Sequence, residues 1–352
     1  MTSYERVRRT LDHQPVDRVP YDIQAEDIVW QRLQDHLGLE SRDAVREHFG
    51  IDRWSVGPRY IGPPLKTFED GSHEIIVSGG PVCKEFMTPT GPTENTVRWP
   101  WADVTDVSDL EGRWGWNGKK EWWDFSHIEE DIDAINETGP KWITAHGDPS
   151  GLQHLSMWVG DEAFLMMLLT DEDLAVAMIE KHNEIRLWHA LKTLEAGHGK
   201  IHELNGGGDY GYQNGPLIPV DMFRRFFKDL YVNFYREIKK NFDVEIFFHS
   251  CGGIEPLIPE LIEAGVTILD PIQSGAAGMD PRTLKKKYGH QLAFHGGIDI
   301  QQFLPHATPE EVRAKRREMI EILGENGGFI LSPSHNLQPD TPVENILAIY
   351  QD

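Results

Sequence analysis

Cysteine, positive charge and long apolar runs are all scarce in this sequence. The chain has two cysteines, Cys83 and Cys251, in 352 residues, which excludes a disulfide scaffold and predicts a reducing, cytoplasmic compartment. Lysine and arginine number 34 against 57 aspartates and glutamates, and the resulting charge of -23 argues against nucleic-acid or anionic-membrane partners. The longest apolar run is the seven residues 163–169, and no apolar segment follows the first methionine, so neither a membrane span nor a signal peptide is expected.

Short β-branched stretches alternate with amphipathic stretches, most regularly after residue 140. The strand-like segments are 19–23, 51–56, 141–146, 200–205, 244–249, 266–270, 291–295 and 328–332. The main helix-like segments are 163–196, 220–241, 255–264, 281–288, 309–323 and 342–350. This alternation indicates an α/β protein with a parallel sheet, and eight such strands close into a TIM (β/α)8 barrel. An open doubly wound sheet is the alternative, and the absence of a suitable Gly-x-Gly-x-x-Gly turn disfavours it.

Residues 57–140 interrupt the alternation. Residues 77–82 are typical of a hairpin tip, and six tryptophans crowd the remainder: Trp99, Trp101, Trp114, Trp116, Trp122 and Trp123. These rings either form a cage for a cationic ligand or, as we favour, pack the segment onto the rest of the protein. We therefore expect one domain, 1–352, in which 57–140 is a helical and hairpin insertion over the barrel mouth.

Two short polar motifs follow predicted strands. His249 and Cys251 close the strand 244–249, and residues two apart on a strand share a face, so an imidazole and a thiol can both point into the barrel mouth. This is a natural zinc pair, although His-x-Cys alone is a weak motif. His335 follows the strand 328–332, where it either caps the next helix or supplies a third ligand across the mouth. Three protein ligands with an open fourth position are typical of catalytic zinc.

Other polar side chains also stand near strand ends. Glu203 is a candidate fourth ligand, or a partner that orients a histidine ligand. Asn205 and Asp270 follow strands as well, without an assigned role. The residues that we expect to bind substrate are Asp22, His146, Asp148, Asp209, Tyr210 and His295.

Several longer motifs occur together along the chain. They are 17–20 (DRVP), 209–211 (DYG), 214–217 (NGPL), 249–252 (HSCG), 295–299 (HGGID), 327–333 (GGFILSP) and 340–345 (DTPVEN). In this combination the sequence resembles the uroporphyrinogen decarboxylase superfamily, over nearly the whole chain and most strongly after residue 140.

Within that superfamily the sequence is most similar to the corrinoid-dependent (cobalamin) methyltransferases. Those enzymes carry His-x-Cys and a distant cysteine as zinc ligands, and the resemblance places His249 and Cys251 on the first two positions. His335 occupies the third, and this departure leaves the metal one charge more positive. The resemblance implies a zinc-dependent methyltransferase that moves a methyl group between a small methylated substrate and a corrinoid. The substrate would be a methoxyaryl compound, a methylamine or a thiol.

The corrinoid is expected on a separate binding protein, because no Asp-x-His-x-x-Gly cobalamin motif occurs in the sequence. Two other functions remain open. One is a metal-independent decarboxylase or lyase of the uroporphyrinogen decarboxylase type, although residues 19–26 lack the arginine pair that holds substrate carboxylates in those decarboxylases. The other is a non-catalytic barrel.

Overall fold

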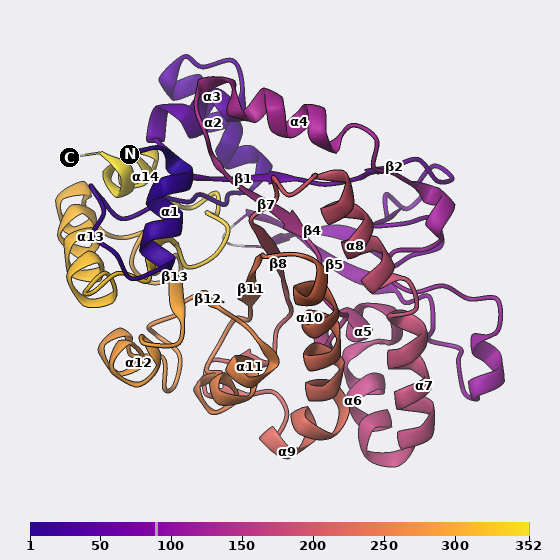
Figure 1. The fold of residues 1–352 in the computed structure, drawn as a ribbon. Helices are drawn as coiled ribbons and strands as arrows, with labels where there is room; N and C mark the ends of the chain where they lie inside the picture. Colours follow the sequence, from indigo (N-terminus) through magenta and orange to yellow (C-terminus); the bar gives the residue numbers. More distant parts are fainter. Residues whose placement is uncertain (89–90, 352) are drawn as a thin grey trace.

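The centre of the molecule is a curled, seven-stranded parallel sheet in the order β1-β7-β8-β11-β12-β13-β14. The computed structural model describes residues 1–88 and 91–351. The central strands are β1 (Arg53–Val56), β7 (Trp142–His146), β8 (Glu203–Gly207), β11 (Glu245–His249), β12 (Ile268–Asp270), β13 (Ala293–Ile298) and β14 (Phe329–Pro333). Figure 1 shows the helices arranged outside these strands. The predicted TIM barrel is thereby confirmed.

Residues 20–22 close the barrel between β14 and β1. The Leu331 amide donates to the Pro20 carbonyl and the Asp22 amide to the Leu331 carbonyl, while on the other side the Asp52 amide donates to Tyr21. The predicted strand 19–23 is reduced to one bridge, between Tyr21 and Leu331. Pro20 has no amide hydrogen to donate. The Tyr21 amide donates to the Asp52 carboxylate at 2.8 Å, outside the backbone ladder.

The helices between successive strands cover the outside of the barrel. They include α8 (Arg186–Ala196), α9 (Val220–Phe223), α10 (Asp229–Asn241), α11 (Ile258–Ala264), α12 (Pro281–Tyr288), α13 (Pro309–Leu323) and α14 (Val343–Tyr350). A π-helical turn, Arg224–Lys228, joins α9 to α10. Near the N-terminus lie α1 (Ser3–Leu11), α2 (Asp27–Leu37) and α3 (Arg42–Phe49). Among the described residues, no helix is long and apolar enough to cross a membrane.

The single helix predicted over 163–196 is wrong. The chain forms α6 (Asp161–Thr170), α7 (Glu172–His182) and α8, after α5 (Leu152–Val159). Asp171 separates α6 from α7 because its side chain accepts the Leu174 amide and caps the new helix. Asn183 ends α7, and its side chain pairs with both the amide and the carbonyl of Ser150.

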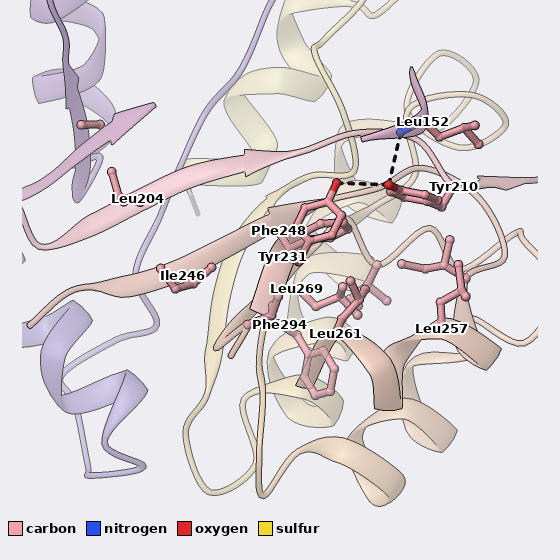
Figure 2. Packing of buried hydrophobic residues seen from close by; sticks show 14 of the residues in the cluster. Leu152, Leu204, Tyr210, Tyr231, Ile246, Phe248, Leu257, Leu261, Leu269 and Phe294 are labelled. Atoms are coloured by element: carbon pink, nitrogen blue, oxygen red, sulfur yellow. Dashed lines mark hydrogen bonds between the residues drawn. The ribbon is translucent and has the colours of Figure 1, made fainter. Parts of the chain in front are cut away.

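Side chains alternate along β11 between the helices and the barrel interior. Ile246 and Phe248 face outward and pack with Tyr231 of α10 and Leu261 of α11 (Figure 2). The intervening residue, Phe247, faces inward and lies 5.1 Å from the ring of His295. His249 follows on the inward face because side chains on a strand alternate with period two. The outward-facing residues of β11 thus anchor the strand to the helices, and its inward-facing residues line the barrel.

The described part of residues 57–140 connects the C-terminal end of β1 to the start of β7. It forms β2 (Arg59–Tyr60), β3 (His73–Glu74), β4 (Val82–Thr88), β5 (Gly91–Arg98), β6 (Trp123–Asp124) and α4 (Ile128–Ile135). Cys83 lies in the β4–β5 hairpin, as expected. Gly91, at one end of the described part of β5, packs against Pro339 in the loop after β14. Trp101 and Trp122 are buried, which agrees with a packing role.

Candidate metal centre

Three side chains with metal-binding atoms converge at the C-terminal end of the barrel. The ligand atoms of His249, Cys251 and His335 all lie within 4.8 Å of one another. Cys251 Sγ is 3.6 Å from His249 Nε2, and the two histidine rings are 5.6 Å apart between centroids. A tetrahedral zinc with ordinary Zn–N and Zn–S bonds holds such a nitrogen and sulfur about 3.5 Å apart. The geometry and the two-nitrogen, one-sulfur donor set both fit zinc.

Backbone contacts between neighbouring strands place these ligands. His249 is the last residue of β11 and lies opposite Asp270 of β12. The chain then turns at Gly252, which has a φ of 86° and lies against Gly211, so that a Cβ there would lie 2.4 Å from the Gly211 carbonyl carbon. The Cys251 amide donates to Asp209 Oδ1 at 2.8 Å. The rigid turn therefore fixes the thiol beside the imidazole.

Asp270 fixes the orientation of His249. His249 Nδ1 lies 2.5 Å from Asp270 Oδ2. Since an ionised carboxylate can only accept a hydrogen bond, Nδ1 must carry the proton, and the lone pair of Nε2 is free to face Cys251 and His335. A carboxylate behind a ligand histidine is the usual partner that sets its tautomer and increases its basicity.

The protonation of the three candidate ligands depends on their surroundings. Burial opposes a charged imidazole at His249, but the hydrogen bonds to Asp270 and Cys251 outweigh it and raise the pKa of His249 well above its usual value. Burial raises the pKa of the Cys251 thiol. Burial, followed by the nearby charge of His249, lowers the pKa of His335. A bound divalent metal would favour the thiolate and the neutral imidazoles over these protonated forms.

A chain of buried charges continues from Asp270 into the barrel. Asp270 Oδ1 lies 2.5 Å from His295 Nδ1, and His295 Nε2 lies 3.0 Å from Asp22 Oδ2. Both nitrogens of His295 face carboxylates, which favour the protonated imidazolium form of the ring, although Arg53 Nη1 also lies 3.2 Å from Nε2. Burial opposes that charge, but Asp270 and Asp22 outweigh it and raise the pKa of His295. Arg53 extends the chain by pairing with Asp22 and with Glu203.

Glu203, predicted as a fourth ligand or as a partner that orients a ligand, lies outside the group formed by His249, Cys251 and His335. It begins β8, whereas Gly207 at the other end of that strand is the register partner of His249. Its carboxylate is fully buried, pairs with Arg53 and accepts the Trp142 indole N–H at 2.8 Å. Burial of a carboxylate requires such partners, and they hold Glu203 low in the barrel.

The six residues predicted to bind substrate divide into three pairs. His146 and Asp209 lie at the mouth: the His146 side chain is 59% exposed, and Asp209 Oδ1 is 3.7 Å from His249 Nε2. Asp22 and His295 are buried in the charged chain just described.

Asp148 and Tyr210 are buried, and their side chains are engaged by partners within the protein. Asp148 is 1% exposed, pairs with Arg186 and accepts the Gly207 amide at 2.8 Å. Tyr210, also 1% exposed, lies in the hydrophobic layer between sheet and helices, where its hydroxyl meets the Leu152 amide and the Tyr231 hydroxyl (Figure 2).

A cavity of about 470 Å³ lies beside the candidate ligands. Cys251 and His335 form part of its wall, together with Gln273, Asp299, Ile300, Gln301, Gln302, Ser334, Gln338 and Asp340. This volume is in the usual range for a small-molecule site. A molecule in the cavity can therefore contact the metal ligands and the polar wall simultaneously.

Arg53 and the role of Asp270 were missed in the sequence. Arg53 is an isolated charge in a short strand, and its pairing with Asp22 of the closing segment and with Glu203 of β8 requires the barrel to be closed. Asp270 carried a usable signal, because it ends the strand predicted to follow that of His249. Neighbouring parallel strands bring their C-terminal residues together, so an acidic partner for His249 was foreseeable.

Residues 153–351, more than half of the chain, match the family model described as uroporphyrinogen decarboxylase (URO-D). The chain belongs to the uroporphyrinogen decarboxylase family. Its candidate metal ligands and the wall of the adjoining cavity all fall within the matched segment.

Curated relatives and a solved structure agree with this family. The chain is 22% identical over 145 residues to the uroporphyrinogen decarboxylase of Coxiella burnetii, a match that covers 39% of this chain and 37% of that protein. A uroporphyrinogen decarboxylase of Magnetococcus marinus is 27% identical over 107 residues, covering 29% of this chain and 30% of its own length. The solved structure of a methyltransferase from Methanosarcina mazei superposes with a TM-score of 0.66 over 99% of this chain and 97% of its own, at 20% identity. That likeness shows a shared fold.

Proposed function

We propose that this protein is a zinc-dependent methyltransferase of the uroporphyrinogen decarboxylase family. It would move a methyl group between a small methylated substrate and a corrinoid that a separate protein carries. The observation that carries the proposal is the convergence of His249, Cys251 and His335 within 4.8 Å at the barrel mouth, beside a cavity of about 470 Å³. The methyltransferase from Methanosarcina mazei, which shares the fold, supports the same reaction class.

The chain's own residues would hold the metal and leave one position open. Zinc so held would supply a Lewis acid that makes a bound thiol or amine easier to deprotonate. His249 presents Nε2 because Asp270 accepts the proton on Nδ1. Cys251 contributes a thiolate once its proton is released. The cavity wall then positions the substrate next to these ligands.

The decarboxylase alternative has support from the description of the matching family and from the names of the curated relatives. A polycarboxylate substrate needs cationic side chains in its pocket. Among the lining residues that the structure describes, none is lysine or arginine, and two are aspartates. Arg53 lies inside the barrel, where Asp22 and Glu203 already neutralise it. The charge of the cavity therefore favours methyl transfer over decarboxylation of a polyanion.

Metal content of matched cysteine variants tests the proposal. We expect about one zinc per chain in the wild type and in Cys83→Ala, and almost none in Cys251→Ala, with all three folded by circular dichroism. Cys83 is the matched control because it is the other cysteine of the chain and lies in the β4–β5 hairpin. A wild-type protein that takes up no zinc on titration would exclude the mechanism.

Methyl transfer itself is measured by absorbance. Mixing zinc-loaded protein with cobalt(I) cobalamin and methoxyaryl, methylamine or methylthioether compounds should yield methylcobalamin with at least one class. The Cys251→Ala variant should be slower by about a thousandfold or more, because loss of a metal ligand removes both metal and orientation. If the protein bound zinc but transferred a methyl group from none of these compounds, to either free cobalamin or a corrinoid protein, the methyltransferase function would be excluded. The zinc site itself would still stand.

A further inference from the structure

The cavity beside the candidate metal ligands carries negative charge and hydrogen-bonding groups on one wall. Its polar lining beyond the metal ligands consists of Gln273, Asp299, Gln301, Gln302, Gln338 and Asp340, with Ser334 next to His335. Asp209 adds a further carboxylate at the metal group itself. No lysine, arginine, phenylalanine, tyrosine or tryptophan occurs among the described lining residues. The wall is thus complementary to a small polar molecule with positive charge or several N–H or O–H donors.

Asp299 is the best-fixed carboxylate of this wall. Its Oδ1 accepts the backbone amides of Gln301, Gln302 and Phe303, at 2.8, 2.6 and 3.1 Å. These three bonds hold the side chain in one orientation. The described residues provide no hydrogen-bond donor to Oδ2, which lies near Gly275. Asp299 therefore offers an oriented, charged acceptor to a molecule in the cavity.

Gln273, another polar residue of the lining, is also fixed by a hydrogen bond. Its side-chain oxygen accepts the Gly252 amide at 2.8 Å, in the turn that follows Cys251. The carboxamide is thereby tied to the loop that carries a candidate metal ligand. Gln273 and Cys251 both line the cavity, so a molecule in it can contact both side chains.

We propose that Asp299 binds the cationic end of the substrate, and that the substrate class is a small amine-bearing compound whose reacting atom faces Cys251 and His335. This inference rests on the proposed function, because it takes the metal ligands as the reacting end of the cavity. A charge-assisted hydrogen bond to a carboxylate is about twice as strong as a neutral one, so it can select one charge type. A methoxyaryl ring would find no aromatic partner in this wall, and an anion would meet Asp299 and Asp340.

Three thiols of similar size and different charge test the inference. Cysteamine is cationic, 2-mercaptoethanol is neutral and 3-mercaptopropionate is anionic. Their binding to the zinc-loaded protein is measured by titration calorimetry, after metal content has been verified separately. We expect cysteamine to bind at least about tenfold more tightly than 3-mercaptopropionate, with 2-mercaptoethanol between them, since tenfold corresponds to one such interaction.

Asp299→Asn should reduce that preference to within about threefold while leaving the affinity for 2-mercaptoethanol unchanged. Asparagine retains an oxygen for the backbone amides, so the loop should survive. The control is Asp280→Asn, because Asp280 also accepts a backbone amide, that of Thr283, at the start of a helix outside the cavity. That variant should keep the wild-type order of affinities.

The outcomes separate the two proposals. Equal affinities, a preference for the anion, no binding of cysteamine, or an unchanged preference in Asp299→Asn would each overturn the role of Asp299. Zinc content decides the proposed function independently, because a zinc-loaded protein with the wrong charge preference retains its metal centre. Absence of zinc from the wild type would overturn both.

Discussion

His182 and His295 are each 1% exposed, yet their protonation differs. His295 has a carboxylate at each ring nitrogen, and these raise its pKa despite burial. His182 packs edge-on against Trp101 and Trp158, and neither of its nitrogens has a hydrogen-bond partner among the described residues. Burial, followed by the positive charge of Arg186, lowers the pKa of His182 well below its usual value. The neighbours of a buried histidine, and not its depth, decide whether it carries charge.

Other histidines near His182 are also neutral, whereas the histidines near His295 belong to the candidate metal group. Beneath the tryptophan-rich segment, burial lowers the pKa of His154 and of His189 to about 3. Their rings pack edge-on against Trp116 and Trp123, at 4.4 and 4.7 Å between centroids. These histidines stay neutral and serve packing. In the part of the chain that the structure describes, His249, Cys251 and His335 are the one group arranged as metal ligands.

Replacing His295 with phenylalanine should have the largest effect. The change leaves Asp270 and Asp22 buried without the cation between them, and breaking a buried ionic network in this way costs about 3 to 5 kcal/mol. The free energy of unfolding in urea at pH 7.5 measures the loss. A decrease in the free energy of unfolding of less than about 1 kcal/mol would contradict a charged His295. His295 and His182 would then not differ in protonation.

Asp270→Asn should weaken zinc binding by about tenfold to a hundredfold. The substitution removes the charge that orients His249, and loss of such a partner typically costs this much metal affinity. Competition with a chromophoric chelator at fixed pH gives the affinity.

Asp148→Asn is the matched control for Asp270→Asn. Asp148 is an equally buried carboxylate, but it pairs with Arg186 in the other region. This variant should lose stability while keeping its zinc affinity. If both variants weakened zinc equally, Asp270 would have no special relation to the metal ligands.

The barrel and its mouth were predictable from local patterns, because strand and helix periods are set by neighbouring residues. His249 and Cys251 could be predicted as a pair of ligands from local sequence alone, because residues two apart at a strand end lie on the same face. His335 is a long-range partner, and its approach depends on closure of the barrel through residues 20–22. The predicted strand 19–23 is longer than the bridge that forms. Pro20 has no amide hydrogen, and the Tyr21 amide donates to the Asp52 carboxylate instead of to a neighbouring strand.

Apart from Asp270, the partners of the buried charges could not be predicted from the sequence. Glu203 stands near a strand end in a motif-like context, and its contact with Arg53 is seen only in the structure. The burial of Asp148 and Tyr210 was likewise not visible in the sequence, because it depends on how the helices pack on the sheet. Which acidic side chain faces which cation depends on the register of strands far apart in the chain.

His182→Phe should have the smallest effect at neutral pH and a pH dependence that isolates the packing histidines. Neither nitrogen of His182 has a described partner, so an aromatic ring of similar shape loses no hydrogen bond, and stability at pH 7.5 should change by less than about 1 kcal/mol. The folded pKa of His182 lies below the unfolded value of 6.5. As pH falls through 6.5, His182 therefore becomes protonated in the unfolded wild type but stays neutral in the folded protein. The free energy of unfolding of the wild type then decreases by up to about 1.4 kcal/mol per pH unit. Phenylalanine has no proton to take up, so at pH 5.5 the variant should be more stable than the wild type by about 1 kcal/mol. Urea unfolding of both proteins at the two pH values measures this difference, and a gap that does not widen toward acid pH would mean that His182 is charged in the folded protein.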